Sequence, residues 1–186
     1  MEIKERNFKG VFEIQLETHK DSRGFYMRVY DAAIFKKYGI HKKWVQENHL
    51  LSVEKNVIRG MHFQLPPHSE TKLVRVISGK IYDVFIDLRK GSSTFGQWDS
   101  INLSAENKKM ICIPQGFAHG FCTLSKNCEV IYKVDNYYSP NYEGNIKWND
   151  PDLGIDWPSN TPILSEKDSR AKSFKEFIEK YKGLKI

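Results

Sequence analysis

The sequence predicts a mainly β protein, a sandwich or barrel of the jelly-roll kind with a few short helices. Short strand-like runs dominate residues 10–136, and Gly, Pro, Asn and Ser separate them at short intervals. Residues 81–88 alternate between two faces with a period of two, as a strand does. Helical periodicity is confined to two short segments. Many short strands with such punctuation are typical of sandwiches and barrels.

The expected strands follow one another through this region. Residues 73–77 and 81–88 flank the turn-like Ser78-Gly79-Lys80, so we expect these two runs to pair as a hairpin. The remaining strand candidates are residues 10–16, 24–30, 44–52, 56–64, 97–103, 110–114, 118–124 and 128–136.

Two helices are predicted. The first covers residues 31–38 and is ended by Gly39. The second covers residues 174–182, with Ser173 as its N-cap and Gly183 as its stop. Its apolar stripe at i, i+3, i+4 and i+7 is expected to be a packing face and consists of Phe174, Phe177, Ile178 and Tyr181.

The chain of 186 residues has the length of a single domain, and we expect one domain over residues 1–186. The jelly roll would occupy about residues 10–136, and an irregular and helical C-terminal tail would occupy residues 139–186. Hydrophobic residues make up 40% of the chain and aromatic residues 13%, which argues against disorder. Four prolines between residues 139 and 164 predict an irregular segment that lies on the barrel.

The net charge and the absence of targeting signals limit the kinds of partner and the cellular location that we expect. The net charge of +6 favours anionic ligands but is too small for a dedicated nucleic-acid binder, so no nucleic-acid partner is expected. No apolar stretch approaches the roughly 20 residues of a membrane span, and the charged start of the chain shows no secretory signal. The three cysteines lack zinc-type spacing. We interpret them as reduced thiols of a cytoplasmic protein.

The densest chemical cluster is Arg59-Gly60-Met61-His62-Phe63-Gln64. Strand alternation places Arg59 and Met61 on one face and His62 and Gln64 on the other. An imidazole titrates near neutral pH and can therefore exchange a proton in either direction. From these six residues alone, a hydrogen-bonded structural histidine is the favoured interpretation.

A second cluster, Pro114–Phe121, carries a PxGxxH pattern that resembles the second motif of the cupin superfamily, in which the histidine is a metal ligand. The first cupin motif needs an HxH pair, but His62 is followed two residues later by Gln64. The remaining donors, His62, His119 and Glu70, lack the expected spacing. A catalytic metal is therefore not expected.

Two further clusters allow both a chemical and a structural interpretation. Arg23 and Arg28 flank aromatic residues and suit phosphate binding and base stacking, although an exposed charged edge strand would look the same. Tyr132 offers a phenol that can protonate an enolate, although aromatic core residues are common in β folds. Neutral polar groups between residues 46 and 52 indicate either a lined cavity or a solvated face.

Taken together, these motifs resemble the dTDP-4-dehydrorhamnose 3,5-epimerase family of nucleotide-sugar epimerases, within the cupin superfamily. The resemblance runs from about residue 8 to residue 170. The matching segments are DSRGFY (21–26), QEN (46–48), RGMHFQ (59–64), KLVRVISGKIYDVFIDLR (72–89), PQGFAHGF (114–121), YK (132–133), YYSPNYE (137–143), WNDP (148–151) and LSEKD (164–168).

The resemblance implies a metal-free, cofactor-independent cupin-type jelly roll that forms a homodimer and acts on a nucleotide-diphosphate sugar. His62 would be the general base, oriented by Asp168, and would remove the protons at C3 and C5 beside the C4 ketone. Lys72 would stabilise the enolate oxygen, and Tyr132 would return the proton on the opposite ring face.

The resemblance also implies a set of substrate-binding residues. Arg23 and Arg59 would bind the pyrophosphate and Tyr138 would stack on the thymine. The rest of the nucleotide-sugar site would be lined by Gln46, Asn48, Ser52, His119, Glu143 and Lys167.

Arg28 departs from the family pattern, because many members carry Glu near the nucleotide at this position. The charge reversal leaves open a GDP- or CDP-linked 4-keto sugar, including a keto-heptose. Epimerisation at C3 only or C5 only also stays open, as does a 3,4-ketoisomerase reaction. A metal-dependent cupin enzyme and a non-catalytic sugar-nucleotide-binding module are the alternatives from other functional classes.

Overall fold

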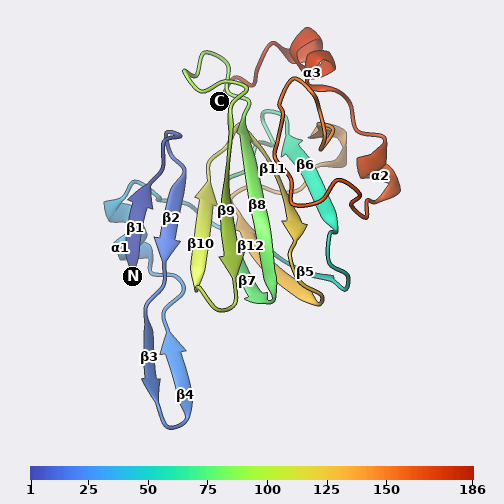
Figure 1. Cartoon of the computed structure of the whole chain (residues 1–186). Coiled ribbons are helices and arrows are strands. Elements are labelled where there is room, and N and C mark those ends of the chain that lie inside the picture. The colour runs from blue at the N-terminus through green and yellow to red at the C-terminus, as the bar shows by residue number, and fades with distance from the viewer.

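The computed structural model describes all residues from 1 to 186 and shows two antiparallel sheets packed face to face as a jelly roll (Figure 1). The six-stranded sheet comprises, in spatial order, β1 (Glu2–Glu5), β2 (Phe12–Gln15), β10 (Lys109–Ile113), β7 (Lys72–Ser78), β12 (Cys128–Val134) and β5 (Gln46–Ser52). The five-stranded sheet comprises β13 (Glu143–Asn145), β6 (Ile58–Gln64), β11 (Phe117–Thr123), β8 (Lys80–Asp87) and β9 (Trp98–Ser104). The mainly β jelly-roll prediction is confirmed.

The predicted hairpin of residues 73–77 and 81–88 is wrong. β7 lies in the six-stranded sheet and β8 in the five-stranded one, so the chain crosses between sheets at Gly79. The true hairpin partner of β8 is β9. The reason is that both faces of β8 are apolar and both are covered: Ile81 and Phe85 face the opposite sheet, whereas Val84 and Ile86 face the C-terminal segment.

Three apolar clusters hold the fold together. The first fills the space between the sheets, where Phe85 of β8 packs edge-on against Phe8 and Phe117. Each such fully buried side chain contributes roughly 1.5–3 kcal/mol by leaving water. The second lies on the outer face of the five-stranded sheet, under the segment from Ile146 to Leu184. The third lies on the outer face of the six-stranded sheet, where Phe35 of α1 is buried.

The helices are short and defined by their caps. In α1 (Ala32–Lys37), Asp31 accepts hydrogen bonds from two backbone N–H groups of the first turn. Ser173 and Glu176 form a capping box at the start of α3 (Phe174–Tyr181), which ends at Lys182 in a left-handed conformation. The helices are too short and too polar to cross a membrane. The other two helical elements are α2 (Glu166–Ser169) and the 3₁₀ turn η1 (Pro140–Tyr142).

The predicted packing stripe of α3 is only partly correct. Phe174 and Phe177 are buried on the five-stranded sheet, whereas Ile178 is 38% exposed. The sequence pattern also missed β1, β3 (Thr18–Asp21) and β13. β1 carries one buried residue among charged ones, β3 has no buried residue, and β13 has only three residues, so none of them has a readable alternation.

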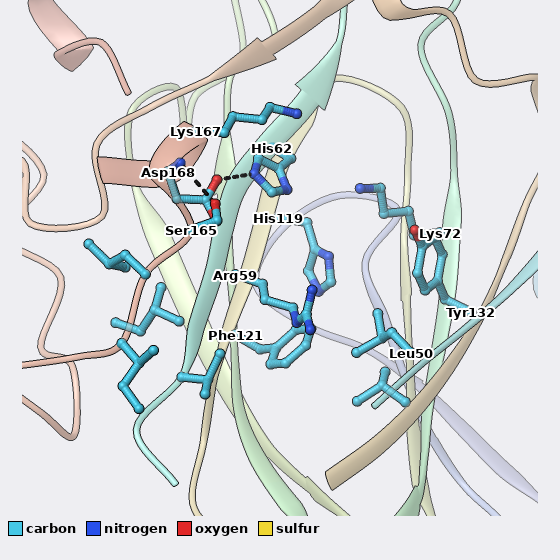
Figure 2. Close-up of a pocket in the computed structure, with 15 residues that line it drawn as sticks. Leu50, Arg59, His62, Lys72, His119, Phe121, Tyr132, Ser165, Lys167 and Asp168 are labelled. Atoms are coloured by element: carbon cyan, nitrogen blue, oxygen red, sulfur yellow. Dashed lines mark hydrogen bonds and ion pairs between the residues drawn. The ribbon is translucent and has the colours of Figure 1, made fainter. Parts of the chain in front are cut away.

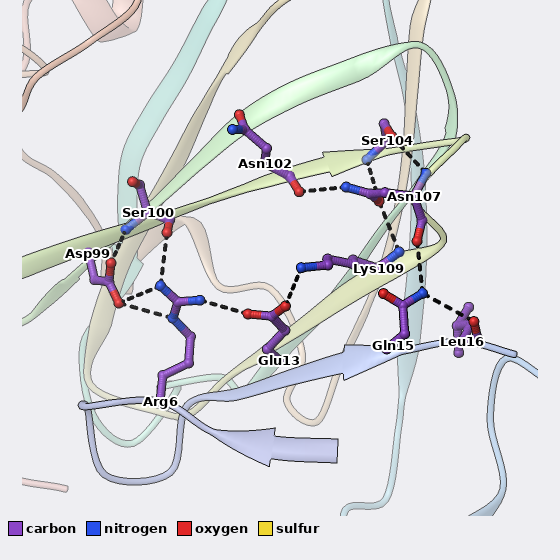
Figure 3. A network of polar contacts seen from close by, with 10 residues as sticks. All are labelled: Arg6, Glu13, Gln15, Leu16, Asp99, Ser100, Asn102, Ser104, Asn107 and Lys109. Atoms are coloured by element: carbon purple, nitrogen blue, oxygen red, sulfur yellow. Dashed lines mark hydrogen bonds and ion pairs between the residues drawn. The ribbon is translucent and has the colours of Figure 1, made fainter. Parts of the chain in front are cut away.

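A polar network ties the edge of the six-stranded sheet to the five-stranded sheet (Figure 3). Arg6 pairs with Glu13 at 2.7 Å and with Asp99 of β9 at 2.9 Å. Lys109 of β10 pairs with the other oxygen of Glu13 at 2.6 Å. The charged side chains of this network are partly buried, and each has a partner of opposite charge. These ion pairs fix the position of the first strands.

β3 (Thr18–Asp21) and β4 (Gly24–Met27) form a separate hairpin that projects away from the two sheets (Figure 1). Its aromatic side chains are exposed, with Phe25 at 53% and Tyr26 at 61%. The projecting hairpin carries Arg23 at its turn.

The contact between β6 and β11 is unusually close. Gly60 has a φ of +129°, and a Cβ placed there would lie 2.5 Å from the Cα of Gly120. The pairing register also shifts here. Three steps along β6, from His62 to Arg59, match two steps along β11, from His119 to Phe121. The extra residue on β6 is a β-bulge, which re-aims the side chains on either side of it.

This contact gives a test of stability. Gly24 has nearly the same φ, +132°, but a Cβ added there would meet nothing within 4 Å, so Gly24→Ala isolates the backbone term of about 1–3 kcal/mol. Gly60→Ala adds an overpacking term of about 1–3 kcal/mol. We expect urea unfolding to show a larger loss of unfolding free energy in Gly60→Ala. Equal losses in the two variants would mean that β6 and β11 can separate without penalty.

Candidate active site

A cavity of about 400 Å³ lies between the two sheets and is closed on one side by the segment that leads into α2 (Figure 2). Apolar side chains form much of its wall, including Leu50 of β5, Phe121 of β11 and Val130 of β12. Five of the charged or titratable groups that the sequence singled out reach it from different elements. Arg59 and His62 come from β6, Lys72 from β7, His119 from β11 and Tyr132 from β12.

His62 and Asp168 form a short polar contact within the cavity lining. The Nε2 of His62 lies 2.6 Å from Oδ1 of Asp168, which comes from α2, 106 residues further along the chain. Ser165 caps α2 by accepting a hydrogen bond from the backbone N–H of Asp168, so this single helical turn presents the carboxylate to the imidazole. The side chain of Asp168 is 4% exposed and that of His62 is 29% exposed, which leaves the imidazole open to the cavity.

The carboxylate of Asp168 stays ionised despite its burial. Burial by itself would raise the pKa of Asp168, but the interactions with His62, Ser165 and the backbone N–H of Gly60 outweigh it and lower the pKa. An anion at this position orients the imidazole by accepting its Nε2–H and leaves Nδ1 as the proton acceptor.

The prediction that Arg59 and His62 lie on opposite strand faces is wrong, because both line the same cavity. The bulge at Gly60 breaks the period of two between them. Arg59 is held by Ser52, whose hydroxyl accepts from Nε at 3.0 Å, and by the carbonyl of Leu51, which accepts from Nη2 at 3.1 Å. Ser52 is buried and contacts the cavity through Arg59.

Tyr132 and Lys72 lie on the wall opposite His62 (Figure 2). The Nζ of Lys72 is 5.8 Å from the centre of the Tyr132 ring. Burial raises the pKa of Tyr132, and the negative charges of Glu70 and Glu143 raise it further, against the opposing charge of Arg59. The phenol is therefore held in its protonated form.

His119 is positioned by a residue that sequence reasoning missed. The Nε2 of His119 lies 2.8 Å from Oδ2 of Asp83, a fully buried aspartate on β8. The other oxygen of Asp83 has no hydrogen-bond partner. The available signal was an aspartate on the same strand face as Ile81 and Phe85, because a lone carboxylate on an apolar face needs a partner.

Four further predicted residues do not line the cavity but connect to residues that do: Gln46, Asn48, Tyr138 and Glu143. Glu143 bridges two elements, since one oxygen pairs with Lys167 at 2.5 Å and the other accepts from the Tyr138 hydroxyl at 3.0 Å. The backbone N–H of Tyr138 donates to the Gln46 side chain at 2.7 Å. Asn48 lies opposite Tyr132 in the register of β5 and β12.

Arg23 and Arg28 do not join this group. Arg23 lies on the projecting hairpin, has a side chain that is 88% exposed and pairs with Asp21 at 2.6 Å. Arg28 pairs with Asp31, the N-cap of α1, at 3.2 Å. Neither residue lines the cavity of its own chain. No cluster of three or more His, Cys, Asp and Glu side chains is arranged to hold a metal ion.

Comparison with known proteins gives a consistent result. A family model described as dTDP-4-dehydrorhamnose 3,5-epimerase matches residues 5–176. The dTDP-4-dehydrorhamnose 3,5-epimerase of Salmonella typhimurium is 52% identical over 153 residues, which cover 81% of this chain and 83% of that protein.

Solved structures with the same fold hold nucleotides. A crystal structure of dTDP-4-dehydrorhamnose 3,5-epimerase from Bacillus anthracis with TDP and PPi bound is 43% identical, with a TM-score of 0.91 over 93% of this chain and 99% of that one. An epimerase structure from Legionella pneumophila in complex with dTDP-4-keto-L-rhamnose is 40% identical, with a TM-score of 0.89 over 94% and 93% of the chains.

The lowered pKa of Asp168 gives a test of the dyad through stability. Because the folded pKa lies below the usual value of 3.8, the ionised carboxylate stabilises the fold above that value, and this contribution is lost as the pH falls through the folded pKa. We expect Asp168→Asn to be less stable than the wild type at pH 7, by about 1–3 kcal/mol, and the difference to shrink below pH 4. Urea unfolding of both proteins from pH 7 to pH 3 measures this. A difference that stays constant across the range would contradict a carboxylate stabilised by His62.

Proposed function

The chain belongs to the dTDP-4-dehydrorhamnose 3,5-epimerase family, and from this premise we propose that it converts dTDP-4-dehydro-6-deoxy-D-glucose to dTDP-4-dehydro-L-rhamnose. The observation that carries the proposal is the placement of His62 and Tyr132 on opposite walls of one cavity, with Lys72 beside Tyr132. The TDP and dTDP-4-keto-L-rhamnose bound to two relatives support a thymidine diphosphate sugar as the substrate.

His62 is the proposed general base. The carboxylate of Asp168 accepts the Nε2–H of His62, so Nδ1 is free to remove a proton from the sugar. The protons at C3 and C5 are acidic because each lies next to the C4 ketone, which takes up the electron pair as an enolate. The substrate thus supplies its own electron sink, and the reaction needs no cofactor.

Lys72 is the proposed stabiliser of the enolate. Its ammonium projects into a cavity with apolar walls, where a fixed positive charge acts more strongly than in water. A preorganised donor at a developing oxyanion contributes about 3–4 kcal/mol to the lowering of the barrier.

Tyr132 is the proposed general acid. Its phenol faces the ring side opposite His62, so a proton returned from Tyr132 inverts the carbon from which His62 removed one. His62 then releases its proton to solvent and Tyr132 regains one, which resets the site for the second centre. Because the raised pKa keeps the phenol protonated, the general acid is lost when the pH rises through that pKa.

The proposed nucleotide site extends from Arg59, which lines the cavity, to Tyr138 outside it. Arg59 would bind the pyrophosphate, since its Nη1 makes no hydrogen bond within the chain. Tyr138 is 54% exposed and suits stacking on the thymine ring. The remaining proposed substrate contacts are Gln46, Asn48, Ser52, His119, Glu143 and Lys167.

We propose a homodimer in which Arg23 and Arg28 act on the partner's site. Both lie outside the cavity of their own chain, and the projecting hairpin exposes Arg23 together with two aromatic side chains. In this homodimer, each chain supplies its Arg23 and Arg28 to the cavity of the other chain. Arg28 would then face the nucleotide, where its positive charge would influence the choice of base.

The three cysteines support a cytoplasmic location. All three are free and buried, and burial raises the pKa of Cys112 to about 12 and that of Cys122 to about 11. Unpaired, buried thiols fit a reducing compartment.

Two variants separate proton removal from inversion. We expect His62→Ala to lose both deuterium uptake at C3 and C5 and formation of the L-sugar, by about 10²–10⁴-fold. Tyr132→Phe should lose the L-sugar by a similar factor but still incorporate deuterium, because His62 can return a deuteron to the face from which it took the proton. Product NMR in deuterated water measures both quantities.

The same NMR experiment tests the choice of substrate when it is run with TDP-, GDP- and CDP-linked 4-keto sugars. Exchange at one carbon only would identify a single-centre epimerase. Full exchange in His62→Ala would remove His62 as the base, and absence of exchange with every sugar would favour a binding protein.

Mixing two inactive variants tests the shared site. If Arg23 serves the partner, a heterodimer of Arg23→Ala and His62→Ala contains one site with both residues intact and one site with neither. We therefore expect activity to appear on mixing, rising toward one intact site per heterodimer. No recovery, in a mixture shown by native mass spectrometry to contain heterodimers, would place Arg23 in its own chain's site or outside catalysis.

A further inference from the structure

We propose that Glu70, which does not line the cavity, is a positioning residue that holds the Lys72 ammonium at the cavity wall beside Tyr132. Oε1 of Glu70 lies 3.3 Å from Nζ of Lys72, and each side chain is only 12% exposed. Lys72 reaches the cavity, whereas Glu70 stands behind it. The inference rests on the proposed function, because it explains how the enolate-stabilising group of that site is placed.

The carboxylate of Glu70 is itself fixed. Its second oxygen accepts a hydrogen bond from Nε2 of Gln64 at 3.1 Å. Gln64 is buried at the end of β6, and its Oε1 accepts from the backbone N–H of Ser139 at 2.7 Å. Ser69, next to Glu70, donates through its hydroxyl to the Gln64 carbonyl at 3.0 Å. One oxygen is thus anchored to the five-stranded sheet and the other is left for Lys72.

Lys72 needs such a partner for two reasons. A lysine ammonium is a compact charge on a flexible four-carbon stem, so it has no preferred position without a contact. Burying that charge is also unfavourable unless an opposite charge compensates it. Glu70 meets both needs, because it is anionic, nearly buried and held by Gln64.

The charge of Glu70 also reaches Tyr132. Two acidic residues outside the cavity lining act on the phenol, Glu70 and Glu143. The charged and titratable groups in the lining itself are Arg59, His62, Lys72, His119, Lys167 and Asp168. Burial has the largest effect on the pKa of Tyr132, and Glu70 is the charged residue that raises this pKa most. Neutralising Glu70 therefore lowers the pKa of Tyr132 and frees Lys72 at the same time.

Glu70→Gln is the decisive variant, because it keeps the size of the side chain and an oxygen for Gln64 but removes the charge. We expect kcat to fall at least about tenfold, since misplacing a catalytic group by about 1 Å can reduce the rate about 10²-fold. KM should change little, because Lys72 acts on the enolate oxygen. The alkaline limb of the kcat profile should move to lower pH, and Glu70→Asp should restore part of the loss.

Two readouts do not depend on turnover. In Glu70→Gln, the Tyr132 signal in ¹³C-tyrosine NMR, assigned by its absence in Tyr132→Phe, should titrate at lower pH than in the wild type. A crystal structure of Glu70→Gln should show Nζ of Lys72 displaced from the Tyr132 ring.

Glu13→Gln is the matched control. Glu13 also holds a lysine at 2.6 Å and is partly buried, but it belongs to the network at the edge of the sheets (Figure 3). This variant should affect stability while kcat, its pH profile and the Tyr132 titration stay as in the wild type. The same shifts in both variants would overturn the proposal and assign the effect to general loosening.

The outcomes separate this inference from the function on which it rests. In one outcome, the wild type epimerises the sugar, and Glu70→Gln leaves kcat, the Tyr132 titration and the position of Lys72 unchanged. This outcome would overturn the role of Glu70 and leave the epimerase intact. In another outcome, the wild type shows no isotope exchange, but Glu70→Gln displaces Lys72 and lowers the pH at which Tyr132 titrates. This outcome would support the role of Glu70 and refute the epimerase.

Discussion

The close packing of β6 on β11 is the constraint on which the site depends. Gly60 and Gly120 let the two backbones approach to a distance that no side chain would allow, and the bulge there adds one residue to β6. Because they are three residues apart, Arg59 and His62 would point to opposite sides of the sheet if β6 were a regular strand without the bulge. The bulge turns both into one cavity, so a backbone feature unites the proposed anion-binding and proton-removing groups.

The two sheets divide the proposed chemistry between them. The base, His62, belongs to the five-stranded sheet, whereas Lys72 and Tyr132 belong to the six-stranded sheet. The distance between the acid and the base is therefore set by the packing of the sheets, through the apolar core that fills the rest of the space. A rigid sandwich suits a reaction in which two groups must act on opposite faces of one sugar ring.

The C-terminal tail is part of the site as well as of the fold. It covers the outer face of the five-stranded sheet with apolar residues and then turns back through α2, which carries Asp168 to His62. Burial of the tail and orientation of the base are thus linked. Loss of packing under the tail would displace Asp168 and, through it, the imidazole of His62. Within that packed layer, only Ile58 and Leu164 line the cavity.

Local patterns in the sequence determined most of the strands, the N-cap at Ser173 and, through the order of the motifs, the family and the residues expected in its site. These features rest on interactions between residues a few positions apart, which a single sequence displays. The structure alone decided that β7 and β8 separate into different sheets, that Arg59 shares a cavity with His62, that Asp83 holds His119 and that Arg23 lies away from the site. Each of these depends on contacts between distant segments, and neither periodicity nor capping preference reports which distant backbone a strand will meet.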